Sequence, residues 1–149
     1  MRALELRRHA RRDPQADALS AEGRAQAQAV GRTLSGPYAV VFVSPARRAA
    51  ETVAWLLRGH GQQLPPHTVV PGLAAGDVDD SPKGLGRVVL ELLQRVPDGA
   101  RGLAVGHTPL IERAVLGLTG RRIEPLGECE GVLLTERDED LAVEELRLG

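Results

Sequence analysis

The chain has 149 residues, of which 42% are hydrophobic and 26% charged, the composition of one ordinary globular domain spanning residues 1–149. The formal net charge of −1 does not favour a nucleic acid or a membrane as partner, and the single cysteine, Cys129, excludes an internal disulfide and a thiolate metal cluster. No apolar run of about 18 residues is present and no signal peptide is recognised, so we expect a cytoplasmic protein with a buried or half-buried thiol.

The N-terminal part of the chain has a strand pattern and then a helix pattern. The apolar opening predicts a short strand from Ala3 that ends near Arg8, and polar residues predict a loop up to Leu19. Ser20 is expected to cap a helix that runs to about Leu34.

The next apolar run, residues 38–43, predicts a strand of a parallel sheet that is covered on both faces. Ser44 is expected as the N-cap of a second helix and Pro45 as its first residue. This helix extends to about Arg58, and glycines within 59–61 close it.

The second half of the chain continues the alternation of strands and helices. The expected elements are a strand over 67–70, a loop over 71–83, a helix over 85–95, a strand over 102–105, a helix that begins at Thr108-Pro109 and ends before 117–120, and two strands over 131–134 and 141–148. This order indicates a three-layer α/β/α domain with a mostly parallel central sheet.

Three strand ends carry side chains that suit an anion. His9, Arg48 and His107 fall at or just past the carboxyl ends of predicted strands, where open parallel sheets form their binding crevice. Helices that begin near Ser44 and Thr108 would direct free N–H groups at the same place. Together these features predict a pocket for an anion, above all a phosphoryl group.

The residue types in this pocket suggest a reaction. A neutral imidazole has a nucleophilic nitrogen that can attack phosphorus, and the forked guanidinium groups can neutralise the phosphoryl oxygens. The second histidine, if protonated, adds a further donor, and the scheme needs neither a metal nor a cofactor. Taken singly, Arg7, Arg11 and Arg12 are expected to be solvated rather than catalytic.

Four stretches in this order and spacing resemble the histidine phosphatase superfamily, which has the phosphoglycerate mutase-like fold. They are Leu6-Arg7-Arg8-His9, Leu19-Ser20-Ala21-Glu22-Gly23, Ser44-Pro45-Ala46-Arg47-Arg48-Ala49-Ala50-Glu51-Thr52 and Val105-Gly106-His107-Thr108-Pro109-Leu110-Ile111-Glu112. The short chain and a middle loop containing Leu73 and Gly76-Asp77-Val78 are most similar to the SixA-type phosphohistidine phosphatases.

The resemblance implies a role for each matching residue. His9 is implied as the nucleophile that forms a phosphohistidine intermediate, Arg8 and Arg48 as the clamp on the phosphoryl oxygens, and His107 as the second pocket histidine. Arg8, Arg48, His107 and Thr108 are the expected substrate-binding residues.

The sequence departs from the family pattern at two positions. Ala10 stands where the motif has glycine, and a Cβ there is unwelcome if the position needs positive φ or a close approach of the backbone to phosphate, so we expect a shifted pocket rather than an inactive one. Ala75 stands where many members have a glutamate general acid, which SixA-type members also lack. A protonated imidazole leaves without much help from an acid, so the absence favours a phosphoramidate substrate. Asp77, Asp79 and Asp80 could supply an acid, or simply form turns.

Other polar residues have weaker claims. His60 and His67 could form a metal pair, but no cluster of carboxylates or thiols accompanies them, so no metal site is expected. Glu51 and Glu112 either orient arginines of the site or are ordinary exposed helix charges.

The leading hypothesis is a metal-independent phosphatase that forms a phosphohistidine intermediate, with a phosphohistidine-bearing protein as favoured substrate and inorganic phosphate as product. The alternatives are a small-molecule phosphomonoesterase of the same superfamily and a catalytically silent phosphate-binding or adaptor domain. Ala10 and Ala75 motivate the silent domain, whereas the presence of His9 argues against it. We expect no nucleic-acid or membrane partner, and a monomer or weak dimer.

Overall fold

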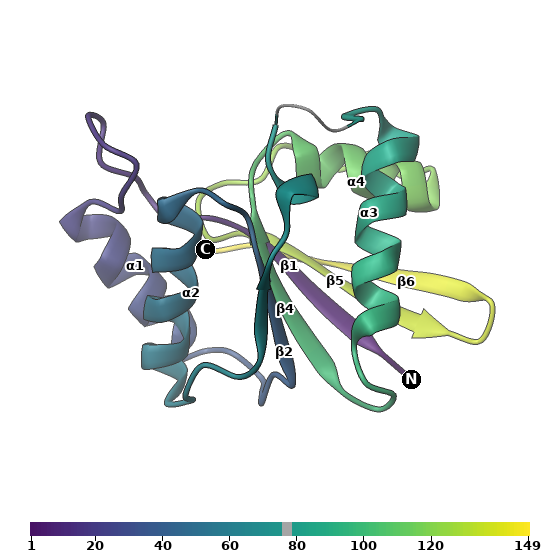
Figure 1. Ribbon diagram of the computed structural model, residues 1–149, viewed down its shortest axis with the longest axis horizontal. Helices are drawn as coiled ribbons and strands as arrows, with labels where there is room; N and C mark the ends of the chain where they lie inside the picture. The colour runs from purple at the N-terminus through teal and green to yellow at the C-terminus, as the bar shows by residue number, and fades with distance from the viewer. Residues whose placement is uncertain (76–78) are drawn as a thin grey trace.

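The computed structural model describes residues 1–75 and 79–149. Over these residues the chain forms six strands and four α-helices, with one 3₁₀ turn (Figure 1). In order they are β1 (Ala3–Arg8), α1 (Ala21–Gly31), β2 (Val40–Val43), α2 (Arg47–His60), β3 (His67–Val69), η1 (Pro71–Leu73), α3 (Pro82–Arg95), β4 (Arg101–Gly106), α4 (Leu110–Thr119), β5 (Gly131–Arg137) and β6 (Asp140–Leu146).

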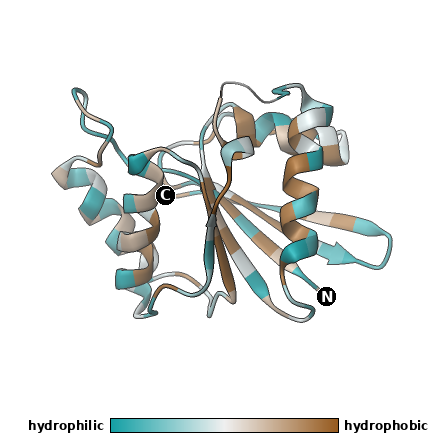
Figure 2. Cartoon of the chain, in the orientation of Figure 1, coloured by the Kyte–Doolittle hydropathy of each residue, from teal (hydrophilic) through white to brown (hydrophobic). Residues whose placement is uncertain are grey.

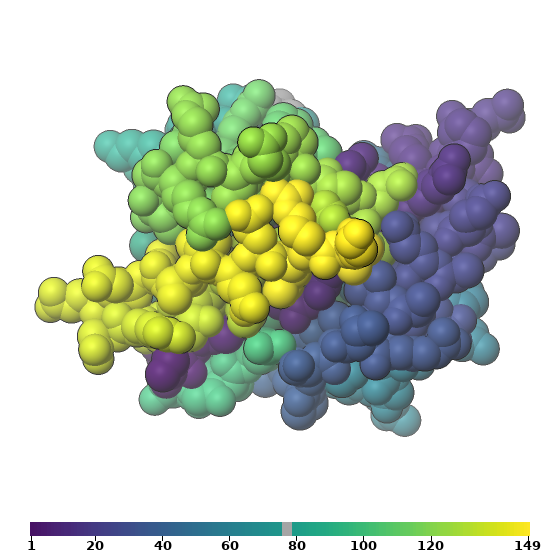
Figure 3. Space-filling view, turned by 180° about the vertical axis from the view of Figure 1, so that it is seen from behind, coloured from purple at the N-terminus to yellow at the C-terminus, as the bar shows by residue number. Residues whose placement is uncertain are grey.

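All strands join one sheet in the order β3-β2-β4-β1-β5-β6. The first four of these are parallel to one another, whereas β5 and β6 pair antiparallel as a C-terminal hairpin. Seen from behind, this hairpin extends along one side of the molecule (Figure 3). The mostly parallel sheet confirms the predicted fold class.

Helices cover both faces of the sheet, so the molecule has three layers (Figure 1). On one face α3 and α4 pack against alternate residues of the strands, including Leu4, Leu6 and Phe42. On the other face α1 and α2 pack against Val41 and Leu103. Figure 2 shows the resulting hydrophobic stripes along the strands and on α3. Because burial on both faces favours apolar residues at consecutive positions, β2 is a continuous hydrophobic run, whereas β1 buries the ion pair of Glu5 and Arg7 on one of its faces.

Ser20, Ser44 and Thr108 were each predicted to start a helix, and the structure confirms this for Ser20. Ser20 caps α1 as predicted, since its hydroxyl accepts a hydrogen bond from the Gly23 amide at 3.0 Å. The predictions for Ser44 and Thr108 were wrong. Helix α2 begins at Arg47 after Ala46, and α4 begins at Leu110 after Pro109, without a side-chain cap. Both hydroxyls instead bond to partners in the site described below, which outweighs their local capping preference.

Two glycines expected to end helices lie inside them instead. Helix α2 continues past Gly59 and ends at Gly61, which has a φ of 81°, and α4 continues past Gly117 to Thr119. A Cβ on Gly59 would overlap the carbonyl oxygen of Gln28 in α1, and one on Gly117 would overlap that of Pro82. These glycines therefore permit close helix packing rather than helix termination.

None of the helices in the described ranges 1–75 and 79–149 is long and apolar enough to cross a membrane.

The packing predicts that Gly59→Ala destabilises the protein. The new methyl group must push α2 away from α1, which should cost roughly 1–3 kcal/mol of unfolding free energy, measured by urea denaturation. Gly86→Ala is the matched comparison, because a Cβ there would meet the α4 backbone at 3.3 Å, a tight contact rather than an overlap, and should therefore cost less than Gly59→Ala. Equal stability of the two variants would contradict the close packing.

Candidate active site

Three segments meet because β4 lies between β1 and β2. The His9 amide, just past β1, donates to the Gly106 carbonyl at the end of β4, at 3.1 Å. The Ser44 amide, just past β2, donates to the Val105 carbonyl, also at 3.1 Å. The carboxyl ends of the three strands are therefore in register, and His9 and His107 have ring centroids 5.3 Å apart.

The hydrogen bonds of His9 indicate which ring nitrogen is free. Its Nδ1 lies 2.7 Å from the Ala10 carbonyl oxygen, which can only accept, so we assign the proton to Nδ1. Its Nε2 receives the Arg48 Nε–H at 3.3 Å and therefore carries the lone pair. The ring is buried, with 7% of the residue exposed, and its nucleophilic nitrogen faces the arginine.

The Arg48 guanidinium uses each of its nitrogens on a different partner. Nε faces His9 Nε2, Nη2 lies 3.4 Å from His107 Nδ1, and Nη1 is 2.9 Å from the Asp17 carboxylate oxygen Oδ1. A guanidinium only donates, so both imidazoles present lone pairs to it. The edge formed by Nε and Nη2 is the geometry that binds two phosphoryl oxygens at once.

His107 is held by the serine that sequence reasoning had placed at a helix cap. Ser44 Oγ lies 2.6 Å from His107 Nε2, and both residues are buried. Because Arg48 faces Nδ1, we assign the His107 proton to Nε2, which donates to Ser44 Oγ.

Both histidines are disposed to be neutral. Burial lowers the pKa of His107 to about 4, and the positive charge of Arg48 adds to this effect. Burial also lowers the pKa of His9, with further lowering by Arg48, Arg8 and Arg12, while the hydrogen bond to the Ala10 carbonyl opposes it. The sequence hypothesis of a protonated second histidine therefore does not describe the free site near pH 7, although a bound dianion would favour protonation.

Arg8, the last residue of β1, directly precedes His9, and its positive charge helps to lower the pKa of that histidine. Its Nη1 donates to the Leu126 carbonyl at 2.8 Å, and its buried Nε has no hydrogen-bond partner within residues 1–75 and 79–149. Glu112 holds the same loop, since its Oε2 accepts from the Leu126 amide at 3.1 Å and from the Thr108 hydroxyl. Glu112 thus holds the residue whose carbonyl anchors Arg8, which agrees with the prediction that it orients an arginine of the site. The Thr108 hydroxyl is bonded to Glu112.

Ala10 does not have the backbone geometry that would demand glycine. Positive φ among non-glycine residues occurs at Cys129 and Asp138 in the described chain, and not at Ala10. The Ala10 methyl group is fully buried in the core against α1 and α2. Its amide donates to the Thr52 hydroxyl at 3.0 Å, and that hydroxyl donates to the Arg48 carbonyl at 2.8 Å. The anticipated backbone strain at Ala10 is therefore absent.

The aspartates considered as acids do not contact this cluster where they are described. Asp77 lies outside the described residues. Asp79 accepts a hydrogen bond from the Ser81 amide at 3.0 Å beside the start of α3, and its bonds to Ser81 lower its pKa. Asp80 lies 3.5 Å from the guanidinium of Arg113.

Sequence reasoning missed two residues that organise the cluster and misjudged a third. Asp17 falls in the loop predicted up to Leu19, and no role is predicted for Asp17 or Thr52. Asp17 bonds Arg48 at the start of α2, and Thr52 bonds the Ala10 amide after β1, contacts that only the three-dimensional structure reveals. Arg7 was expected to be solvated but is 5% exposed, with Nε 2.5 Å from Glu5 Oε2 and Nη1 2.6 Å from the Cys129 carbonyl. The central place of β1 in a sheet covered on both faces, with Glu5 on the same face as a partner, is the signal that could have placed Arg7 inside.

The remaining metal-ligating side chains are dispersed. No group of three or more His, Cys, Asp or Glu side chains suited to a metal is found in the described part of the chain. Cys129 is buried as predicted, and burial raises the pKa of its thiol to about 12.

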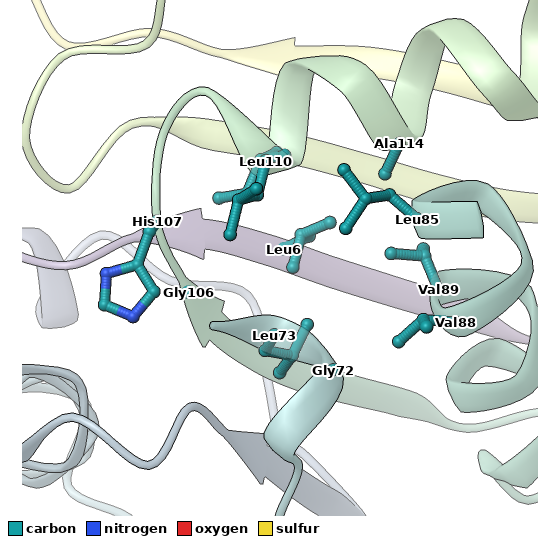
Figure 4. A pocket seen from close by; sticks show the side chains of 11 residues that line it. Leu6, Gly72, Leu73, Leu85, Val88, Val89, Gly106, His107, Leu110 and Ala114 are labelled. Carbon is teal, nitrogen blue, oxygen red and sulfur yellow. The ribbon is translucent and has the colours of Figure 1, made fainter. Parts of the chain in front are cut away.

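An apolar wall backs the site on the α3/α4 side. Leu6, Leu73, Leu85 and Leu110 gather around a gap of about 10 Å³, with the His107 ring at their edge (Figure 4). This space is at the lower limit for one water molecule, so the wall excludes solvent behind His107 rather than binding a ligand.

The sequence profile of the histidine phosphatase superfamily (branch 1) matches residues 4–83, just over half of the chain. The chain belongs to this superfamily, whose members are phosphatases. A search of curated proteins gave no sequence match.

Solved structures support the same fold. A phosphoserine phosphatase from Entamoeba histolytica, in complex with 3-phosphoglyceric acid, superposes with a TM-score of 0.79 at 16% identity, covering 100% of this chain and 98% of the other. The protein histidine phosphatase SixA complexed with tungstate has a TM-score of 0.75 at 22% identity, covering 97% and 96%. A phosphoglycerate mutase from Bacillus anthracis str. Sterne has a TM-score of 0.80 at 13% identity, covering 96% and 91%.

The geometry predicts that Arg48→Gln raises the pKa of both His9 and His107, because it removes the cation that faces both rings. Burial should still hold each pKa below the ordinary histidine value of 6.5. NMR titration of the imidazole nitrogens measures both. Arg47→Gln is the matched control, since that guanidinium pairs with Glu51 at 2.9 Å instead. Unchanged titration in Arg48→Gln would contradict the assigned contacts.

Proposed function

We propose that this protein is a phosphatase in which His9 Nε2 attacks phosphorus and a phosphohistidine-bearing protein is the favoured substrate. The observation that carries the proposal is the fixed tautomer of His9, with Nδ1–H held by the Ala10 carbonyl and Nε2 facing Arg48. Such an arrangement presents a neutral, aligned lone pair, which is what nucleophilic catalysis by imidazole requires.

In the first step the His9 Nε2–P bond forms and the bond from phosphorus to the leaving group breaks. Arg48 offers Nε and Nη2 to the equatorial oxygens, and the positive charge of Arg8, the residue before His9, adds to the field at this place. These donors are in place before the charge shifts, so they stabilise the transition state without reorganisation.

In the second step water attacks phosphorus, the P–Nε2 bond breaks, and inorganic phosphate leaves. His9 regains its lone pair and keeps its Nδ1 proton throughout, because the Ala10 carbonyl continues to accept it. His107 lies beside the reacting group and would become a charged donor once the phosphoryl dianion raises its pKa. No step requires a metal ion.

Among the described residues, neither candidate general acid is bonded to the histidines, which supports a phosphoramidate as substrate. An alkyl ester needs a proton for its leaving oxygen, but Asp79 and Asp80 are engaged with Ser81 and Arg113 instead of the histidines. A phosphohistidine that is protonated on its second ring nitrogen releases a neutral imidazole when its P–N bond breaks, so this leaving group needs no acid from the enzyme.

The alternative of a catalytically silent binding domain rests on Ala10 and Ala75, and the backbone geometry of Ala10 does not support it. The methyl group of Ala10 fits the core without positive φ, so it gives no reason for a lost activity. A binding domain also has no use for a buried imidazole with a fixed tautomer.

The proposal predicts an acid-labile phosphate adduct on the wild-type enzyme after rapid quenching with a phosphoryl donor. His9→Ala should give no adduct and no turnover, because no other lone pair replaces Nε2. Intact-mass analysis measures the adduct. His67→Ala is the matched control, since His67 is exposed on β3 and should leave the adduct intact. A wild-type enzyme with neither adduct nor turnover would refute the proposal.

The lack of an assigned acid gives a separate prediction for Asp77→Asn, Asp79→Asn and Asp80→Asn. None of the three substitutions should produce the loss of roughly 100-fold or more that removal of a general acid causes. Steady-state rates with phenyl phosphate, whose phenolate is a poor leaving group, measure the effect. The control substrate is p-nitrophenyl phosphate, whose nitrophenolate leaves without an acid. A large loss confined to phenyl phosphate would favour the phosphomonoesterase alternative.

A further inference from the structure

Asp17 lies at the mouth of the site although no motif singles it out. It belongs to the loop between Arg12 and Leu19, two residues that pair across the loop as an isolated bridge. Its carboxylate accepts from the backbone amides of Arg47 at 2.8 Å and Arg48 at 3.1 Å, and from Arg48 Nη1 at 2.9 Å. The amides at the start of α2, which sequence reasoning had assigned to the substrate anion, are therefore bonded to a carboxylate of the protein itself.

This carboxylate is charged and faces outward as well as inward. Partial burial works to raise the pKa of Asp17, but its hydrogen bonds from Arg47 and Arg48 outweigh this and hold the pKa at about 2. Its side chain is 46% exposed. Its field also reaches into the pocket, since Asp17 is among the groups that raise the pKa of His107. A negatively charged carboxylate therefore lies close to His9 Nε2, separated from it by the guanidinium of Arg48, which contacts both.

We propose that Asp17 is a specificity-determining residue, which favours phosphoryl donors that carry a positive charge on the group beyond phosphorus, such as a protonated phosphoimidazole, over donors that carry a negative charge there. This inference rests on the proposed phosphatase function and narrows its substrate class. In this proposal the phosphoryl oxygens bind the Nε and Nη2 edge of Arg48, and the group beyond phosphorus lies within the field of the Asp17 carboxylate, which holds the Nη1 of the same guanidinium.

The proposed role suits the chemistry of phosphohistidine. A phosphoimidazole that carries a proton on its other nitrogen is positively charged at the ring, and attack by His9 transfers the P–N electron pair to that ring, which departs as neutral imidazole. A nearby carboxylate stabilises the charged ring before attack. Asp17 is ionised and donates no proton, so it selects the protonated substrate rather than acting as an acid.

Asp17→Asn tests the proposal with a matched set of aryl phosphates. Asparagine keeps the shape and one of the two acceptor oxygens at the start of α2, and it is a favourable residue before a helix, so the fold should be retained. The substrates are phenyl phosphates with a para nitro, carboxylate or trimethylammonium group. The ratio of kcat/KM for the carboxylate over the trimethylammonium substrate is compared between variant and wild type, so that differences in leaving-group reactivity cancel.

We expect this ratio to rise on the order of five- to tenfold in Asp17→Asn, and to rise less at high salt, where charge interactions are screened. Asp13→Asn is the control, because it removes a charge from the same loop, where Asp13 bonds the Gln15 amide at 2.8 Å rather than Arg48. Its ratio should match that of the wild type.

Two results would overturn the inference on its own. If Asp17→Asn changes all three substrates by the same factor, Asp17 only positions Arg48. If Asp13→Asn shifts the ratio equally, the effect belongs to the net charge of the loop. Absence of turnover in the wild-type enzyme with all three aryl phosphates and with phosphoimidazole would instead refute the underlying phosphatase function, and this inference with it.

Discussion

The Arg48 guanidinium is the interaction on which the site depends. It connects a carboxylate to two buried imidazoles, and it can do so because α2 starts beside β1 and β4. The cation and the burial act in the same direction on the histidines, since both disfavour a charged ring. Thr52 secures the arrangement from within α2, because its hydroxyl joins the peptide after His9 to the carbonyl of Arg48.

Much of the fold could be predicted from the sequence because its signals are local. Continuous apolar runs indicated the parallel strands, and Ser20 indicated the start of α1. Ser44 and Thr108 carry the same capping signal, yet their hydroxyls bond to His107 and Glu112. A sequence pattern cannot rank a cap against a tertiary partner, because that ranking depends on what the fold brings near.

The same reason explains which parts of the site were predicted. His9, Arg48 and His107 end strands or follow them directly, so the rule for parallel sheets brought them together in advance. Asp17 lies in a loop and acts on residues 30 and 31 positions away, for which no local rule exists. Charge alone was also misleading for Arg7, whose partners Glu5 and the Cys129 carbonyl make a buried cation tolerable.

The position of β4 has a consequence for how the protein is made. β4 separates β1 from β2 in the sheet but follows both in the chain, beginning only at Arg101. During synthesis the first 100 residues therefore emerge without the strand that aligns His9 with Arg48, and both strands wait with unpaired edges. The central sheet, and with it the alignment of the site, is therefore completed only after β4 has been synthesised.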